Sequence, residues 1–372
     1  MRHHFFAALR DSRSGAVTPD NATKPARASM DALLAADQPI LALAPMQDVT
    51  DLAFWRLVHS YGGADLYVTE YFRVYPTSTP DPTILRAVTE NPTGCPVIAQ
   101  LIGNDIPALV RTARQLQAYP IAGIDLNLGC PAPVVCRKRA GGGLLRQPER
   151  IDAILAALRD AVTTRLTVKA RVGFDSPALF DDLLGVLARH RLDLVTVHGR
   201  TVTELYRSQV RYDLIARAVT RLPCPVLANG NVSSAAKALR ILDETGARGL
   251  MIGRGAIRNP WIFRQIRQAL RRESARPPTG RDVLAYLEGL LDATRIPGMR
   301  ERLHIQRVKK TATFVGLGID PAGEFLHQIR RVTTEAHFHR VCRAFLDHDE
   351  PMPLEPFPLP LMETDVLSGP HA

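Results

Sequence analysis

The sequence predicts an α/β protein, a (β/α)8 TIM barrel that is followed by a small all-helical domain. Short apolar runs alternate with amphipathic segments of helical length over roughly 220 residues, and beyond residue 264 only helical patterns remain. Near-continuous apolar strands separated by helices are typical of a parallel sheet that is buried on both faces. Eight such units match a closed barrel better than an open sheet.

Each element follows from its place in this alternation. Strands are expected at residues 40–44, 66–69, 97–102, 124–128, 166–172, 194–198, 226–229 and 250–252. The helices between them are expected at residues 52–61, 106–118, 148–162, 177–190, 212–220 and 234–245. The segment 71–96 is long and rich in proline, so the second unit needs an extra excursion. Three further helices are expected at residues 281–294, 303–315 and 325–346.

These elements divide the chain into four parts. Residues 1–38 carry scattered prolines and polar side chains and are expected to form a flexible extension. Residues 39–263 form the barrel and residues 264–348 the helical domain. Residues 349–372 contain six prolines, which argue for an extended or disordered tail.

Basic residues outnumber acidic ones, with 47 Lys and Arg against 37 Asp and Glu and a formal net charge of +10. Residues 264–343 hold 16 basic and 8 acidic residues, so most of the excess lies in the helical domain. A concentrated positive charge favours a polyanionic partner such as a nucleic acid. The alternative is an arginine-rich surface that contacts only water.

Composition excludes several classes of protein. No run approaches the roughly 20 apolar residues of a membrane-spanning helix, and the first residues lack the apolar core of a signal peptide. The five cysteines are odd in number and show no paired spacing, so neither a disulfide framework nor a metal site is expected. We therefore expect a cytoplasmic protein without membrane contact.

Polar residues and glycines follow nearly every expected strand. In a barrel the carboxyl ends of the strands meet at one rim, where active sites lie. One such polar residue is more often structural, but so many together predict a shared pocket, because each would otherwise need its own buried partner. The residues at these strand ends are Pro45, Met46, Gln47, Gln100, Asn127, Cys130, Lys169, Arg171, His198, Arg200, Asn229, Gly230, Asn231, Gly253 and Arg254.

Two features of this rim have a specific chemical interpretation. Gly230 and Gly253 let backbone amides approach an anion, and a short helix near Ala256 would direct its positive end there. Arg254 would add charge-assisted hydrogen bonds, so a phosphate-bearing cofactor is expected. Lys169 and His198, on adjacent strands, would donate to an electron-accepting ring, although a salt-bridge role for Lys169 is the simpler alternative.

The motifs together resemble the tRNA-dihydrouridine synthase family. They lie in order between about residues 40 and 345, and the stretch 69–74 is similar to the bacterial class C branch. The resemblance implies a flavin-bearing barrel with FMN as cofactor, and a helical tRNA-binding domain. It implies reduction of the 5,6 double bond of uridine in tRNA, with NADPH as the reductant. The matching residues are 44–46, 69–70, 100, 127–131, 141–145, 168–171, 197–200, 229–230 and 253–255.

The resemblance also implies roles for single residues. Cys130 occupies the position of the acid that protonates C5 of uracil while hydride from reduced FMN reaches C6; Cys136 is expected to be a bystander. The glycines at 141–143 are expected to form a loop that closes over substrate, and Tyr71, Phe72 or Arg171 to contact the flipped base. FMN is expected to contact Pro45, Met46, Gln47, Gln100, Asn127, Lys169, His198, Asn229, Gly230, Asn231, Gly253 and Arg254. The tRNA is expected to contact Arg137, Lys138, Arg139, Arg171, Arg200, Arg307 and Lys310.

Three interpretations compete. The first is a tRNA uridine reductase that acts as a monomer without a stable protein partner. The second is an FMN-dependent barrel oxidoreductase of a free pyrimidine or a dihydroorotate-like molecule, and the third is a catalytically silent RNA-binding relative. The basic helical domain favours the first over the second, because a small substrate needs no distant phosphate contacts. Intact Cys130, Lys169 and His198 argue against the third.

Overall fold

A computed structural model describes residues 29–357 of the chain. Within that range nine strands form one sheet, in which neighbouring strands are parallel. Their order is β2-β1-β9-β8-β7-β6-β5-β4-β3, and a pairing between β2 and β4 closes eight of them into a barrel. The strands are β1 (Ile40–Leu43), β2 (Leu66–Val68), β3 (Phe72–Arg73), β4 (Val97–Ile102), β5 (Gly123–Leu128), β6 (Arg165–Arg171), β7 (Leu194–His198), β8 (Val226–Asn229) and β9 (Gly249–Ile252).

The predicted barrel and its eight strands are therefore confirmed. The strand β3 was not predicted, because a strand of two residues forms no recognisable apolar run. The segment that was expected to make an excursion contains β3 and the helix α3 (Pro82–Glu90). Asp81 caps that helix by accepting a hydrogen bond from the Thr83 amide, and Pro82 occupies its first turn.

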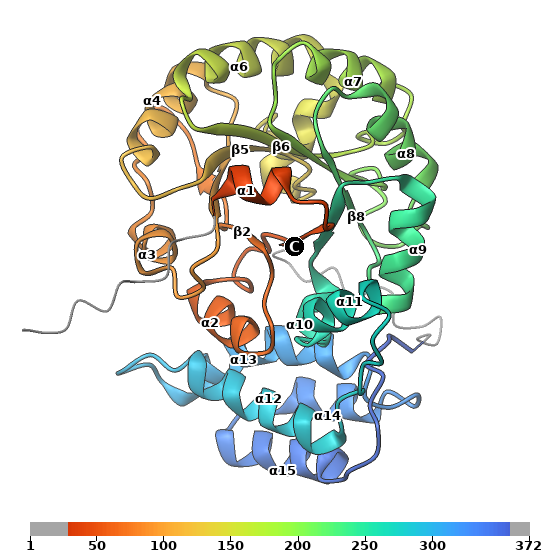
Figure 1. Cartoon of the computed structure of the whole chain (residues 1–372). Coiled ribbons are helices and arrows are strands. Elements are labelled where there is room, and N and C mark those ends of the chain that lie inside the picture. Colours follow the sequence, from red (N-terminus) through yellow and green to blue (C-terminus); the bar gives the residue numbers. More distant parts are fainter. Residues whose placement is uncertain (1–28, 358–372) are drawn as a thin grey trace, which may run out of the picture.

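A ring of helices covers the outside of the barrel (Figure 1). Side chains of Asp51, Asp105 and Ser234 cap three of them by accepting hydrogen bonds from first-turn amides. The last helix of the ring packs against α9 and crosses the predicted domain boundary between residues 263 and 264, so it lies with the barrel. The ring comprises α2 (Leu52–Ser60), α3 (Pro82–Glu90), α4 (Ile106–Leu116), α6 (Pro148–Ala161), α7 (Phe180–Ala188), α8 (Tyr212–Arg221), α9 (Ala235–Thr245) and α11 (Ile262–Leu270).

The amino end of the barrel is covered by the helix α1 (Met30–Ala35) (Figure 1). Ser29 caps this helix, and Met30 is buried in a cluster that includes Ile40 and Leu227 from the strands. The prediction that residues 1–38 form a flexible extension is therefore wrong for residues 30–35. The apolar end of the barrel needs a cover, and Met30 supplies it. Residues 1–28 lie outside the described range.

Four helices form a separate apolar core beside the barrel (Figure 1). The first begins at a capping box, in which Thr279 and Asp282 satisfy each other's backbone amides. The predicted single helix over 325–346 is wrong: Val332 is extended and Thr334 caps a new helix by accepting from the His337 amide. The four helices are α12 (Gly280–Ala293), α13 (Glu301–Gly316), α14 (Glu324–Arg331) and α15 (Glu335–Leu346).

Residues 349–357 form an extended strap that runs back from α15 to the barrel. The Met352 amide donates to the Pro278 carbonyl at 2.7 Å, and the Phe357 amide donates to the Leu317 carbonyl at 2.9 Å. Met352 and Leu354 are buried in the core of the helical domain. The predicted tail is thus extended here but well packed, because its apolar residues cover that core; residues 358–372 lie outside the described range. None of the helices between residues 29 and 357 has the length and apolar character needed to cross a bilayer.

Candidate active site

The carboxyl ends of the strands open into one cleft with a volume of about 950 Å³. Helix α13 forms one of its walls through Lys310 and Phe314, and the strap adds Phe357. The barrel, the helical domain and the strap therefore build the cleft together. The predicted residues that line it are Pro45, Met46, Gln47, Asn127, Cys130, Arg137, Lys169, Arg171, His198, Asn229, Gly230, Asn231, Gly253, Arg254 and Lys310.

Cys130 lies at the end of β5, where the chain turns sharply. The Asn127 side-chain oxygen accepts hydrogen bonds from the Gly129 and Cys130 amides, both at 2.9 Å, and so fixes this turn. Burial raises the pKa of the Cys130 thiol above its usual range, while smaller effects from the Ala132 backbone and the Tyr71 side chain oppose that rise. At neutral pH the thiol therefore keeps its proton, as a proton donor must.

Tyr71 links the thiol to a cation. Its side chain lies beside both Cys130 and Arg73, and the Arg73 guanidinium lies 5.8 Å from the centre of the tyrosine ring. Both residues line the cleft. Phe72 points away from it and is buried in the barrel core, so only Tyr71 of these two aromatic residues is placed to meet a ligand.

The glycine run after Cys130 is packed, and the predicted role as a flexible closing loop is wrong. It forms a buried 3-10 helix, η1 (Gly141–Arg146), behind the short helix α5 (Pro133–Arg137). The Gly142 amide donates to the Cys130 carbonyl at 3.1 Å, and a Cβ on Gly142 would lie 2.8 Å from that oxygen. Glycine is needed here because the backbone of η1 presses against the cysteine turn. Cys136 is buried on the far side, with its thiol 3.5 Å from the same carbonyl.

Lys169 on β6 and His198 on β7 both line the cleft, on adjacent strands as predicted, although His198 lies opposite Arg171 rather than Lys169 in the register. The Lys169 ammonium donates to the Asn229 side-chain oxygen at 3.2 Å, and Asn229 in turn donates to the Met251 carbonyl at 2.7 Å. Burial lowers the pKa of Lys169 to about 8, with a smaller effect from Arg171. Burial and the nearby cations hold the pKa of His198 well below its usual value, so its imidazole is neutral at pH 7.

Arg200 lies beneath His198 and orients it. Its side chain is 2% exposed, it donates to the Ser208 carbonyl at 2.6 Å, and its guanidinium lies 3.4 Å from His198 Nε2. Because a guanidinium can only donate, Nε2 accepts and the ring proton sits on Nδ1. Arg200 is thus too deeply buried for the predicted contact with tRNA.

The predicted anion site lies where β8 and β9 end. The short helix α10 (Arg254–Arg258) begins there, two residues earlier than expected, and a Cβ on Gly255 would lie 2.0 Å from the Val232 carbonyl oxygen. The Arg254 guanidinium lies 3.4 Å from the Asn231 oxygen and stacks 4.2 Å from the centre of the Tyr206 ring. The loops after β8 and β9 are thus in close contact, and the Arg254 guanidinium of the second loop reaches Asn231 in the first.

The charge of this corner is strongly unbalanced. Burial first, and the neighbouring charge of Arg254 second, lower the pKa of Arg200 and of Arg258, each to about 10. Such mutual repulsion is relieved by a bound anion. Within the described part of the chain, Asp48 is the single acidic residue of the cleft lining, against the cations Arg73, Arg137, Lys169, Arg171, Lys237, Arg254, Arg258 and Lys310.

Several predicted residues do not reach the cleft. Gln100 is fully buried behind Asn127, and Lys138 and Arg139 follow the end of α5 and are exposed outside the cleft lining. Arg307 forms an ion pair with Asp51, and Lys310 forms one with Asp48 at 3.2 Å. Both cations therefore pair with acidic residues of the segment after β1, and of the two Lys310 remains exposed and lines the cleft.

The cleft also contains residues that were not predicted from the sequence. Arg258 donates to the Leu354 carbonyl at 2.7 Å, and Lys237 and Tyr206 line the cleft near Arg254. The position of Lys237 in the first turn after the Asn229 loop was a usable signal. Tyr206 and the strap residue Phe357 could not have been predicted in the same way. Their contacts in the cleft join segments that are far apart in the sequence.

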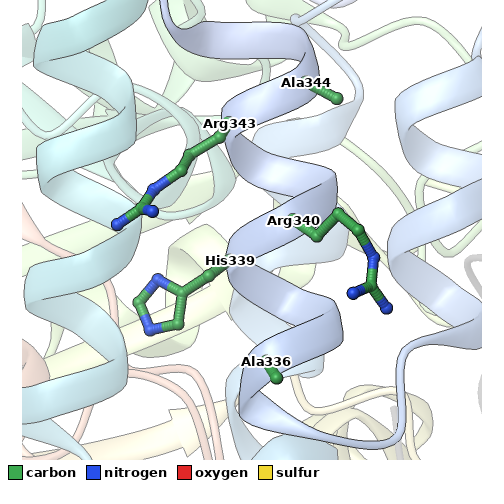
Figure 2. A pocket seen from close by; sticks show the side chains of 5 residues that line it. All are labelled: Ala336, His339, Arg340, Arg343 and Ala344. Atoms are coloured by element: carbon green, nitrogen blue, oxygen red, sulfur yellow. The ribbon is translucent and has the colours of Figure 1, made fainter.

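An exposed face of α15 carries positive charge (Figure 2). His339 and Arg343 point to one side of the helix, where both lie near Glu288, at 3.2 and 3.6 Å. Arg340 points to the other side and is exposed. Arg340 and Arg343 thus line the same surface hollow, while their side chains diverge.

Residues 42–348 match the family model described as Dihydrouridine synthase (Dus). The tRNA-dihydrouridine synthase B of Yersinia pestis is 37% identical over 254 residues, which cover 68% of this chain and 78% of that protein. The tRNA-dihydrouridine(16) synthase of Ralstonia nicotianae is 33% identical over 306 residues, which cover 80% of this chain and 93% of that protein. Relatives with both names match at similar identity, so the class C assignment stays a prediction.

Proposed function

The chain belongs to the dihydrouridine synthase family, and from this premise we propose that it reduces specific uridines of tRNA to 5,6-dihydrouridine. FMN is the proposed bound cofactor and NADPH the proposed reductant. The observation that carries the proposal is the meeting of Cys130, Lys169 and His198 in one cleft of about 950 Å³. A redox cofactor and a planar base fit such a volume.

The residues present fit FMN. The Gln47 side-chain oxygen is buried with no hydrogen-bond partner among the described residues, as expected of a group that awaits a ligand donor. A Cβ on Gly230 would come within 3.1 Å of His198, so glycine keeps this corner open. Lys169 and His198 would hold the ring, and Arg254 and Lys237 the phosphate. When bound, FMN would supply the hydride that reaches C6 of uracil.

The chain's own contribution to the chemistry is a proton. Cys130 would give its proton to C5, and Tyr71 would then donate a hydrogen bond to the thiolate that remains. Arg73 and Arg171 add positive charge beside the same sulfur. The turn held by Asn127 keeps the thiol directed at the cleft.

We propose tRNA as the substrate because the cleft and the helical domain are both cationic. Arg73 and Arg137 line the mouth and are exposed, so they can meet phosphates beside a flipped uridine. The face of α15 with Arg340 would contact a more distant part of the same RNA. A monomeric, cytoplasmic enzyme is consistent with this proposal.

The test is to map dihydrouridine in tRNA from a strain that lacks the gene, and then to restore the gene or its variants. Wild type and Cys136→Ala should restore the modification, whereas Cys130→Ala should not. Cys136 is the matched control because it lies six residues away but outside the cleft lining. Unchanged dihydrouridine in the deletion strain, together with turnover of free pyrimidines by the purified protein, would favour the small-molecule oxidoreductase.

A further inference from the structure

A chain of buried side chains leads from the interior of the barrel to Cys130. Asp125 on β5 accepts hydrogen bonds from the Thr167 hydroxyl at 2.6 Å and from the Gln100 amide at 2.8 Å. The Gln100 oxygen accepts from the Asn127 amide, also at 2.8 Å. The Asn127 oxygen then accepts from the Cys130 amide.

We propose that Asp125 is a positioning residue for Cys130, acting through the side-chain amides of Gln100 and Asn127. This inference rests on the proposed function only for its effect on turnover. The geometry of the relay stands without it, since all four residues are in contact and three of them are 7% exposed or less.

The direction of each hydrogen bond follows from the one before it. A carboxylate only accepts, so Gln100 must turn its NH2 group toward Asp125 and its oxygen toward Asn127. That oxygen only accepts, so Asn127 must donate to it and direct its own oxygen at the Gly129 and Cys130 amides. Without Asp125 the side-chain amides of Gln100 and Asn127 are free to flip. The backbone N–H groups of the turn that holds Cys130 would then face the NH2 group of Asn127 instead of its oxygen.

Such a flip would destabilise the backbone turn that holds Cys130. A buried backbone N–H that loses its acceptor is destabilised, so the turn would relax toward solvent. A shift of about 1 Å in a reacting group lowers a rate by on the order of 100-fold. Asp125 lies outside the cleft lining, so it acts on the reaction through Cys130 rather than by touching substrate.

Two substitutions of Asp125 separate the relay from the charge. Both Asp125→Asn and Asp125→Leu remove the carboxylate that faces Lys169. The Asn side chain can still accept from Gln100 and can donate to Thr167, whose hydroxyl can turn to the Ile124 carbonyl at 3.5 Å. The Leu side chain can do neither. Asp125→Asn is therefore the matched control for the hydrogen bonds.

The first readout is alkylation of Cys130 by iodoacetamide, followed by peptide mass spectrometry. We expect Asp125→Leu to react several-fold faster than the parent because its turn is looser, and Asp125→Asn to react at the parent rate. The second readout is flavin re-oxidation by tRNA after reduction with NADPH. It should fall by on the order of 100-fold in Asp125→Leu and stay close to the parent rate in Asp125→Asn.

Equal behaviour of the two variants in both readouts would overturn the relay and assign the effect to the lost charge. Slower turnover without a change in alkylation would also overturn it. If Asp125→Leu does not fold, as judged by circular dichroism and FMN titration, Gln100→Leu breaks the relay one step nearer to Cys130 and replaces it. If the parent protein fails to reduce tRNA, the proposed function falls, while the alkylation comparison still decides the relay.

Discussion

The Lys169 ammonium lies 3.2 Å from the Asn229 side-chain oxygen, which joins β6 to β8 across the intervening strand β7. Both residues line the cleft, and His198 on β7 lies between their strands. Three consecutive strands thus present a cation, a neutral imidazole and an amide to the same ligand. The lysine is the member of this group whose charge changes near neutral pH.

We expect the affinity of the protein for FMN to fall as the pH rises through about 8. Burial lowers the pKa of Lys169 to about 8, so the ammonium that would hold the flavin is charged below this pH and neutral above it. FMN fluorescence quenching measured across this range tests the expectation. Lys169→Arg should bind without the decline, since arginine stays charged. If the affinity of Lys169→Met for FMN fell with pH as much as that of the parent, the pH dependence would belong to another group.

Replacement of Cys130 by alanine should separate the two half-reactions. The variant should bind FMN and be reduced by NADPH at the parent rate, because Cys130 would serve only in proton donation. Its re-oxidation by tRNA should slow by about 10²- to 10⁴-fold, which is the usual contribution of a general acid. Stopped-flow absorbance follows both steps. Parent-like re-oxidation would place the acid elsewhere.

Gly141→Ala should destabilise the protein by about 1–3 kcal/mol. Gly141 has a φ of +52°, and a Cβ there would lie 2.9 Å from Ile102 and 3.1 Å from the Cβ of Cys130. Thermal unfolding monitored by circular dichroism measures the change. Gly185→Ala is the control: it lies within α7 with open space around it, so it should stabilise by about 0.5–1 kcal/mol. A Gly141→Ala variant as stable as the parent would show that η1 can yield.

Two arginine substitutions should affect tRNA binding differently. Arg340→Gln removes an exposed charge and should lower the slope of log affinity against log salt by about 0.7–0.9. Arg307→Gln removes a cation that is already paired with Asp51, so the slope should stay unchanged while the melting temperature falls. Filter binding over a range of salt concentrations compares them. The opposite pattern would show that the Arg307 pair opens to admit phosphate.

Glu70→Gln should stabilise the protein more at pH 8 than at pH 5. Burial, with smaller effects from Asp51 and Asp48, raises the pKa of Glu70 to about 7. The folded state therefore binds a proton that the unfolded state has released, and stability falls as the pH rises from about 4.5 to about 7. Glutamine keeps an acceptor for the Asp48 amide without the charge. Equal shifts in melting temperature at both pH values would contradict this assignment.

The sequence alone determined the barrel and most of the cleft. Apolar periodicity located eight strands because each strand is buried on both faces, and in a parallel barrel every strand ends at one rim. Residues such as Asn127, Lys169, His198 and Arg254 were therefore brought together by topology. The apolar strand that precedes each of these residues was enough to predict its place at the rim.

Contacts between distant segments could be decided only by the tertiary structure. Tyr71 and Cys130 lie on different loops, and Gln100, the acceptor for the Asn127 amide, comes from another strand. The pairing of Arg307 and Lys310 with acidic residues depends on how α13 docks on the barrel, as does the closure of the cleft by the strap. Local propensity reports which face of a helix is polar, but what that face meets is set by packing over the whole chain.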